Sequence, residues 1–317
     1  MKRGYQISVM VCALSMYIAV SPVSALRVSL YKATIDAAEE IILGNTDTVS
    51  FKVAITTPQG LPFSSDRDGP VELWATYGQF IKPDGTISDS PMSVQVENGE
   101  FQAAVSLKGF DIVPHPLTIR VTKGPYEDHE LLGEAKVNVL YPASVAVSDA
   151  SSLSAAADGA AHPVANVIFK DQFGQPLKGL QVRVLGYSED GEILGNTDDR
   201  GEARIRLPAR TQAGYYTYQV QGGSISSPII WVLCTKGQIP TMPLRNGVSR
   251  AKAQLIWDST SRTASAESPL FQVRVREGES HALLNGNRIP LGTAARLKDG
   301  RIEVPVLFLR QVIGLKV

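Results

Sequence analysis

Two acidic turns are the positions where this sequence could bind a metal ion. The first contains Asp66 and Asp68, and the second contains Asp198 and Asp199, which follow an acidic stretch with Asp190 and Glu192. Carboxylate oxygens at alternate positions suit Ca²⁺. Neither turn has the full spacing of a calcium-binding loop, and ordinary solvated turns explain both. These residues are therefore weak calcium candidates, and no other metal is expected.

The residue types needed for hydrolysis do not occur at catalytic spacing. The sequence has no Gly-x-Ser-x-Gly elbow and no His-Glu-x-x-His segment. Its four histidines fall in unrelated turns: His115, His129, His162 and His281. We therefore expect no catalytic residue and no cofactor, and we predict that the chain is not an enzyme.

Cysteine usage allows no intrachain disulfide in the mature protein. Cys12 lies in a segment that we expect to be removed, which leaves Cys234 alone. Cys234 follows an apolar strand, and a cysteine in such a place is usually buried and inert.

The first residues are typical of an export signal. Lys2 and Arg3 precede an apolar run from Ile7 to Val20 that is short for a membrane span, and small residues follow it. Cleavage is expected near Ala25, so the mature chain (residues 26–317) would be secreted or held at the cell surface, without a membrane span.

Composition favours a mostly β protein of several domains. The 317 residues include 27 glycines and 19 prolines, with few candidate helices. The chain carries 31 basic and 31 acidic residues. This balance provides no overall field for nucleic acid or anionic lipid, so neither is expected as a partner.

Strand patterns divide the mature chain into units. Residues 26–140 contain about seven strands with alternating apolar residues, as in Phe51-Lys52-Val53-Ala54-Ile55, which predicts a β-sandwich. Residues 37–43 could form a short helical turn. Residues 141–234 repeat this order: Asn98-Gly99-Glu100 corresponds to Arg200-Gly201-Glu202, and Leu117–Val121 corresponds to Tyr216–Val220.

Aromatic residues in these strands are mostly expected in the core. Alternation places Tyr216 and Tyr218 on one side of a strand and Tyr215 on the other, so part of this cluster must be buried. The three tryptophans lie within apolar strand patterns and are also expected in the core: Trp74, Trp231 and Trp257.

Residues 141–234 resemble a bacterial Ig-like domain of the invasin and intimin type. The motifs that carry the resemblance are Ala157-Asp158-Gly159, Asp171-Gln172-Phe173-Gly174-Gln175-Pro176, Thr197-Asp198-Asp199-Arg200-Gly201 and Gly214-Tyr215-Tyr216. Gly174 and Gly201 would supply positive φ in tight turns. The resemblance implies a spacer or stalk domain.

Residues 235–251 are expected to be a linker, and residues 252–317 form a different unit. This unit resembles the β-rich N-terminal domain of copper amine oxidases, through Trp257-Asp258, Leu284-Asn285-Gly286 and Asp299-Gly300-Arg301. Asn285-Gly286 predicts a hairpin, and a short helix is expected between Pro305 and Gly314. A catalytic copper site would need an Asn-Tyr pair and converging histidines, which the sequence lacks.

We expect an exported, non-catalytic surface protein in which two Ig-like sandwiches present the C-terminal unit to a cell-envelope polymer or a surface protein. In one alternative, the chain is an adhesin or carbohydrate-binding protein that uses loops 58–70 and 78–91 of the first sandwich. In another, it is the accessory subunit of an oxidase.

Overall fold

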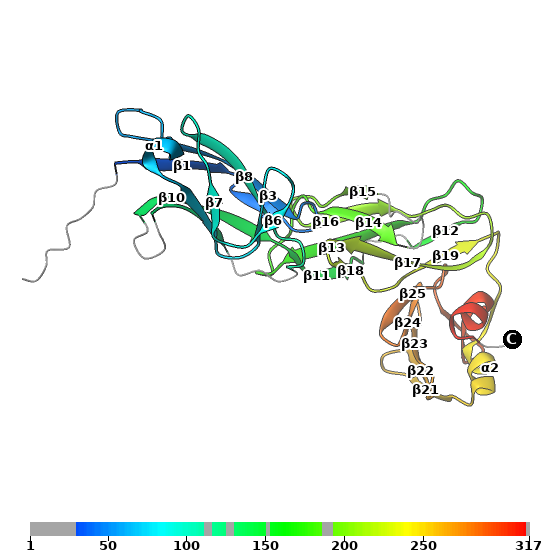
Figure 1. Cartoon of the computed structure of the whole chain (residues 1–317). Helices are drawn as coiled ribbons and strands as arrows, with labels where there is room; N and C mark the ends of the chain where they lie inside the picture. Colours follow the sequence, from blue (N-terminus) through cyan, green and yellow to red (C-terminus); the bar gives the residue numbers. More distant parts are fainter. Residues whose placement is uncertain (1–29, 111–115, 125–129, 150–152, 186–192, 315–317) are drawn as a thin grey trace, which may run out of the picture.

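The computed structural model describes residues 30–110, 116–124, 130–149, 153–185 and 193–314. Two β-sandwiches follow one another end to end, and a smaller module lies beside the far end of the second sandwich (Figure 1). Strands dominate all three parts, which confirms the prediction of a mostly β chain. No helix in these ranges has the length and apolar character needed to cross a membrane.

The first sandwich packs two five-stranded sheets face to face. One sheet has the order β1 (Lys32–Ala37), β3 (Thr48–Thr56), β8 (Glu100–Ser106), β5 (Gln79–Ile81) and β6 (Ile87–Ser88). The other has the order β2 (Glu40–Ile42), β10 (Glu130–Leu140), β9 (Leu117–Lys123), β4 (Val71–Ala75) and β7 (Met92–Val94). A single helical turn, α1 (Ser65–Asp68), precedes β4.

The second sandwich has a smaller first sheet. Its strands are β11 (Pro142–Val147), β13 (Val164–Asp171) and β16 (Glu202–Arg206). The facing sheet has the order β12 (Ser154–Ala156), β19 (Ile230–Thr235), β17 (Gly214–Gly222), β14 (Gln181–Leu185) and β15 (Ile193–Asn196), with β18 (Ile225–Ser226) paired to β17.

The two sandwiches share one strand order. The order β1-β3-β8 of the first corresponds to β11-β13-β16 of the second, and β2-β10-β9-β4 corresponds to β12-β19-β17-β14. Even the parallel pairs agree, because β2 runs parallel to β10 and β12 runs parallel to β19. This confirms the predicted correspondence of strands. It also corrects the helical turn expected over residues 37–43, because β2 occupies that place and pairs with β10.

The C-terminal module comprises residues 241–314. Its main sheet is an antiparallel meander of β21 (Gln254–Asp258), β22 (Thr263–Glu267), β23 (Gln272–Arg276), β24 (His281–Leu284) and β25 (Asn287–Pro290). A second sheet contains β20 (Thr241–Pro243), β27 (Arg301–Pro305) and β26 (Arg296–Lys298). The helical segments are α2 (Leu244–Val248), the 3₁₀ turn η1 (Ser249–Ala251) and the π-helix η2 (Phe308–Val312).

The module begins earlier in the chain than its strand pattern indicates. The expected linker over residues 235–251 contains β20, which pairs with β27, and α2, whose Leu244 and Val248 are buried in the module's core. The predicted hairpin at Asn285-Gly286 joins β24 to β25, with φ values of 49° and 83°. The predicted C-terminal helix is short and contains η2.

Each part has its own hydrophobic core. Phe51, Phe63 and Phe80 belong to the core of the first sandwich, Phe169 belongs to that of the second, and Phe308 belongs to that of the C-terminal module. Alternation of buried and exposed residues along the strands supplies these side chains, as along β3 and β13. The parts therefore have separate hydrophobic cores that meet at junctions.

Candidate binding surface on the C-terminal module

Tyr215 fixes the C-terminal module against the second sandwich. Its ring lies on the opposite side of β17 from the sandwich core, and its hydroxyl donates a hydrogen bond of 2.7 Å to the Pro290 carbonyl at the end of β25. Its backbone N–H donates to Oε1 of Gln311 in η2 at 2.8 Å. Burial raises the pKa of Tyr215 far above its usual value, so the hydroxyl stays protonated and keeps donating. Trp231 of β19 packs edge-on against the Tyr215 ring.

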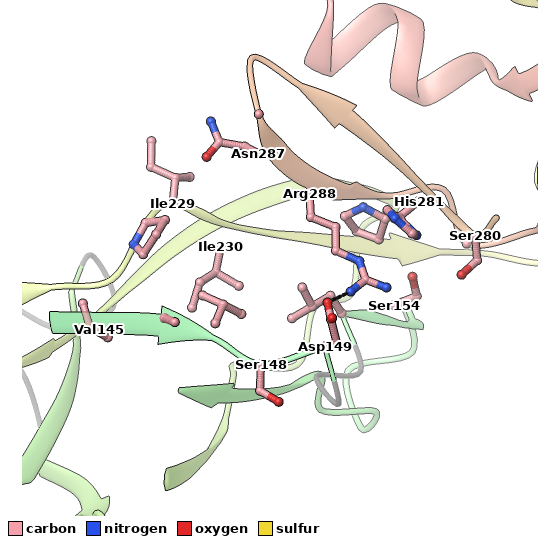
Figure 2. A pocket seen from close by; sticks show the side chains of 17 residues that line it. Val145, Ser148, Asp149, Ser154, Ile229, Ile230, Ser280, His281, Asn287 and Arg288 are labelled. Atoms are coloured by element: carbon pink, nitrogen blue, oxygen red, sulfur yellow. Dashed lines mark hydrogen bonds and ion pairs between the residues drawn. The ribbon is translucent and has the colours of Figure 1, made fainter. Parts of the chain in front are cut away.

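A groove of about 640 Å³ lies at this junction, and both modules line it. Val145 and Ser148, in and just after β11, form one wall together with Ile229 and Ile230, and His281 and Arg288 of the C-terminal sheet form the other (Figure 2). Backbone at Gly286 and Gly292 completes the wall of the C-terminal module. The groove therefore combines an apolar wall with a wall that carries a cation and an imidazole.

Charged groups lie across the groove. Arg288 forms an ion pair with Asp149, which joins the C-terminal module to the segment after β11 (Figure 2). Nδ1 of His281 is buried without a hydrogen bond and lies 3.4 Å from a carboxylate oxygen of Glu279. Burial and the positive charge of Arg288 lower the pKa of His281, whereas Glu279 and Asp149 oppose this effect. The imidazole is consequently neutral at pH 7.

The balanced overall charge conceals a separation of charge along the chain. Residues 235–317 contain 13 basic and 6 acidic residues, whereas residues 26–140 contain 9 basic and 16 acidic residues. The balance of the whole chain therefore does not describe the C-terminal module, whose net charge is positive. Counting charges for each unit, instead of for the whole chain, would have revealed this from the sequence.

Two large apolar side chains are exposed on the edge strand of the C-terminal sheet. Ile256 is 56% exposed and Trp257 is 41% exposed, on opposite faces of β21. Trp257 was expected in the core, but β21 is the outermost strand of the sheet and has no neighbour beyond it in the described part of the chain. Trp74 is partly buried on the outer face of β4, and Trp231 is partly buried where it packs against the core of the C-terminal module, so none of the three tryptophans is a buried core residue.

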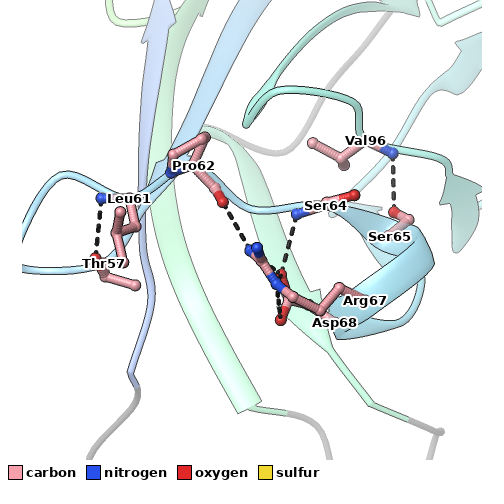
Figure 3. Close-up of polar contacts among 8 residues, drawn as sticks. All are labelled: Thr57, Leu61, Pro62, Ser64, Ser65, Arg67, Asp68 and Val96. Carbon is pink, nitrogen blue, oxygen red and sulfur yellow. Dashed lines mark hydrogen bonds and ion pairs between the residues drawn. The ribbon is translucent and has the colours of Figure 1, made fainter.

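The first calcium candidate is an ion-paired helical turn. Asp68 accepts hydrogen bonds from Nη2 of Arg67 at 2.8 Å and from the backbone N–H of Ser64 at 3.0 Å (Figure 3). The hydrogen bond from Arg67 is the main reason why the pKa of Asp68 lies far below its usual value. Asp66 is exposed in the same turn. The Asp68 oxygens are already engaged by donors within the protein.

The second calcium candidate is a tight turn closed by one carboxylate. Asp198 accepts hydrogen bonds from the backbone N–H groups of Arg200 and Glu202, both at 2.9 Å, and these lower its pKa. Asp199 is exposed and pairs with Lys178 at 2.6 Å. Asp190 and Glu192 lie outside the described residues. Within the described ranges, no group of three or more His, Cys, Asp or Glu residues is arranged to hold a metal ion, and calcium binding stays a prediction.

The three tyrosines of β17 pack against two different hydrophobic cores. Tyr218 is buried in the second sandwich, and Tyr216 packs beside it beneath the Arg210 guanidinium, which is 4.6 Å from the ring centre. Tyr215 faces the C-terminal module. The prediction that part of this cluster is core is confirmed, and Tyr215 packs at the junction with the C-terminal module.

Cys234 is fully buried at the end of β19. Burial raises the pKa of its thiol, although the positive charge of Arg210 partly opposes this. The structure thus confirms a buried thiol.

The loops of the first sandwich expose single apolar residues. Leu61 and Ile87 are well exposed in loops 58–70 and 78–91, respectively. Hydrogen bonds fix much of loop 58–70 in place. Arg67 also donates to the Pro62 carbonyl at 2.9 Å, and Ser65 accepts from the Val96 N–H at 2.9 Å (Figure 3).

Comparison with known families gives one match. Residues 233–317 match the model of the copper amine oxidase N-terminal domain, which confirms the predicted resemblance and includes β20 and α2. The matched domain is the N-terminal one, not the catalytic one. No curated protein matches the chain.

Several solved structures of bacterial surface proteins resemble the chain at low identity. The D0–D1 domain of intimin is 12% identical, with 63% of this chain and 97% of that chain covered and a TM-score of 0.22. Invasin, described as a bacterial integrin-binding protein, is 14% identical, with 82% and 47% covered and a TM-score of 0.27. Domains 4 and 5 of the S-layer protein SbsC are 16% identical, with 66% and 98% covered and a TM-score of 0.27. The present chain thus spans about half the length of invasin.

Proposed function

We propose that this chain is an exported, non-catalytic bacterial surface protein. In this proposal, the two sandwiches act as spacers and the C-terminal module binds a partner in the cell envelope. The partner is an envelope polymer or a surface protein. The observation that carries the proposal is the groove at the end of the molecule, where an apolar wall from the second sandwich faces the Arg288 and His281 wall of a basic module.

The junctions support a spacer role for the sandwiches. Side chains bridge both junctions directly, Asn45 between the two sandwiches and Tyr215 at the C-terminal module, so each module is held by more than a chain linker. A series of modules with separate cores and bridged junctions can hold a binding site at a fixed distance from its point of attachment.

Truncation in the cells that produce the protein tests this function. The deletion should start at residue 237, because a deletion from residue 252 would leave β20 and α2 with Leu244 and Val248 uncovered. We expect the full chain to fractionate with the envelope and the truncated chain to appear in the medium. A truncated chain that still fractionates with the envelope would contradict the proposal. A matched deletion of residues 26–140, which keeps the leader, should leave envelope association intact.

A further inference from the structure

The outer face of the C-terminal sheet carries a group of arginines, most of which do not line the groove. Alternation along β23 buries Val273 and Val275 and leaves Arg274 and Arg276 exposed on the other face. The strand register places Leu283 of β24 opposite Arg274, and it places Arg288 of β25 opposite Leu283. We call Arg274, Arg276, Leu283 and Arg288 the arginine face.

Two of these arginines have no acidic partner in the described part of the chain. Other arginines of the module are paired: Arg262 with Glu277 at 2.7 Å, and Arg288 with Asp149. Within the described ranges, Arg274 and Arg276 take part in no ion pair. On the same face, Glu267 lies opposite Gln272, and Asp258 lies opposite Thr263, which is itself opposite Arg276. The guanidinium groups of Arg274 and Arg276 are therefore not engaged by these carboxylates.

The spacing of the arginine face suits an extended ligand. Arg274 and Arg276 are two residues apart on one strand, which is about 7 Å, and Arg274 and Arg288 are two strands apart, which is about 10 Å. An open sheet face of this kind does not enclose a small anion. A chain with repeated negative charges can instead contact several guanidinium groups at once, and its affinity increases with the number of these contacts.

The surroundings of the face favour a carbohydrate or polyol chain. Leu283 is 38% exposed between Arg274 and Arg288, so apolar surface lies between the cations where a sugar ring or a polyol segment can pack. At β25 the face runs into the groove, whose far wall belongs to the second sandwich (Figure 2). A concave corner of this kind accepts a flexible chain better than a flat bilayer.

We infer that the arginine face binds an anionic carbohydrate or polyol polymer of the cell envelope, through its repeated phosphate or carboxylate groups. This inference rests on the proposed function and names the chemistry of its partner. Arg274 and Arg276 supply charge-assisted hydrogen bonds, Leu283 packs against the uncharged units, and the groove beside Arg288 receives the continuing chain.

Charge-matched variants of the mature chain (residues 26–317) test the site. The test variant is Arg274→Gln with Arg276→Gln, and the control is Lys298→Gln with Arg301→Gln, which removes the same charge from exposed positions in the other sheet. The probes are linear polyphosphate and polygalacturonate, and binding is measured by calorimetry at two salt concentrations. Thermal unfolding checks that both variants are folded.

We expect the test variant to bind the better probe about 10- to 30-fold more weakly, since each basic residue at an anionic surface contributes roughly a fivefold change in affinity. We expect the affinity of the control to fall by less than about threefold. We also expect binding of the unaltered chain to weaken as the salt concentration rises. The better probe identifies phosphate or carboxylate as the anionic group.

Three results would overturn the inference. In the first, neither probe binds or the test variant binds as well as the unaltered chain. In the second, both variants lose the same share of their affinity for the probe, which would mean that net charge and not this face drives binding. In the third, duplex DNA or anionic lipid vesicles bind more tightly than both probes with the same dependence on Arg274 and Arg276. If the truncation test succeeds while this one fails, the proposed function stands and its partner has another chemistry.

Discussion

At the scale of single residues, glycines at corresponding turns hold each sandwich together. The backbone N–H of Phe169 donates to the Gly201 carbonyl at 2.8 Å, and that of Ile55 donates to the Gly99 carbonyl at 2.7 Å. A Cβ atom on Gly201 would lie 2.3 Å from the carbonyl oxygen of Phe169, and one on Gly99 would lie 2.8 Å from that of Ile55. Both glycines have positive φ. Both sandwiches thus require a glycine at this corresponding turn, Gly99 in the first and Gly201 in the second.

Replacing Gly201 with alanine should destabilise the second sandwich by more than about 2 kcal/mol, because a methyl group meets backbone in addition to the cost of positive φ. Gly174→Ala is the matched control, since Gly174 has a similar φ of 77° and no atom within 4 Å of its would-be Cβ. It should cost about 1 kcal/mol. Equal losses in chemical unfolding of the two variants would show that the close approach at Gly201 does not matter.

His281 should make stability depend on pH. Its pKa in the folded protein lies below the ordinary value of 6.5, so the unfolded chain takes up a proton at a higher pH than the folded chain does. Stability is therefore lost as the pH falls through 6.5 and levels off below the folded pKa. His281→Gln should lose less stability than the unaltered chain between pH 7.5 and pH 5. Urea unfolding followed by tryptophan fluorescence measures this, and parallel curves for the two proteins would refute it.

Individual residues differ in how well the sequence predicts them. The turn glycines Gly174 and Gly201 and the buried Cys234 follow from local patterns, because turn geometry and apolar neighbours lie within a few residues. The exposure of Trp257 does not, because alternation places it on the inner face and only the position of β21 at the sheet edge leaves it uncovered. The arginine face was also missed, because it depends on which strands become neighbours.

At the scale of elements, the junction between the sandwiches depends on two side-chain amides. Asn45 donates from Nδ2 to the Gly179 carbonyl and accepts from the Gln181 N–H, both at 2.7 Å. Gln172 makes the corresponding pair of contacts with Val139 and Tyr141. Each amide satisfies a backbone donor and a backbone acceptor across or beside the junction, so the contact is directional.

Asn45→Ala should loosen this junction without unfolding either sandwich. The change removes two hydrogen bonds of about 1 kcal/mol each, but no core side chain. We expect small-angle X-ray scattering to report a broader range of overall dimensions, with the melting temperatures changed little. Gln254→Ala, at an exposed position of β21 away from both junctions, is the control and should change neither quantity. A scattering curve identical to that of the unaltered chain would show that Asn45 does not restrain the junction.

Strands that alternate over five or more residues, such as β3, β13 and β23, could be predicted from the sequence. The short elements β2, β20 and α2 could not. Three residues cannot display a period, and these strands exist because of distant partners: β20 pairs with β27 about sixty residues later, and β2 pairs with β10. Local patterns therefore placed the start of the C-terminal module too late.

At the scale of the whole molecule, charge and architecture vary together. The acidic first sandwich lies at one end and the basic C-terminal module lies at the other, with the second sandwich between them (Figure 1). An anionic envelope polymer, the partner inferred above, would repel the acidic end and attract the basic end. Under the proposed function, this arrangement would orient the C-terminal module toward the envelope and the first sandwich away from it.

The most direct test of this account is co-sedimentation of purified fragments with isolated envelope from the producing cells. The fragments are a three-module chain (residues 26–317), a chain without the C-terminal module (residues 26–236) and a chain without the first sandwich (residues 141–317). We predict that the first and third sediment with the envelope and that the second stays in solution. Sedimentation of residues 26–236 at the level of the three-module chain, with loss of residues 141–317 to the supernatant, would contradict the account and assign binding to the first sandwich.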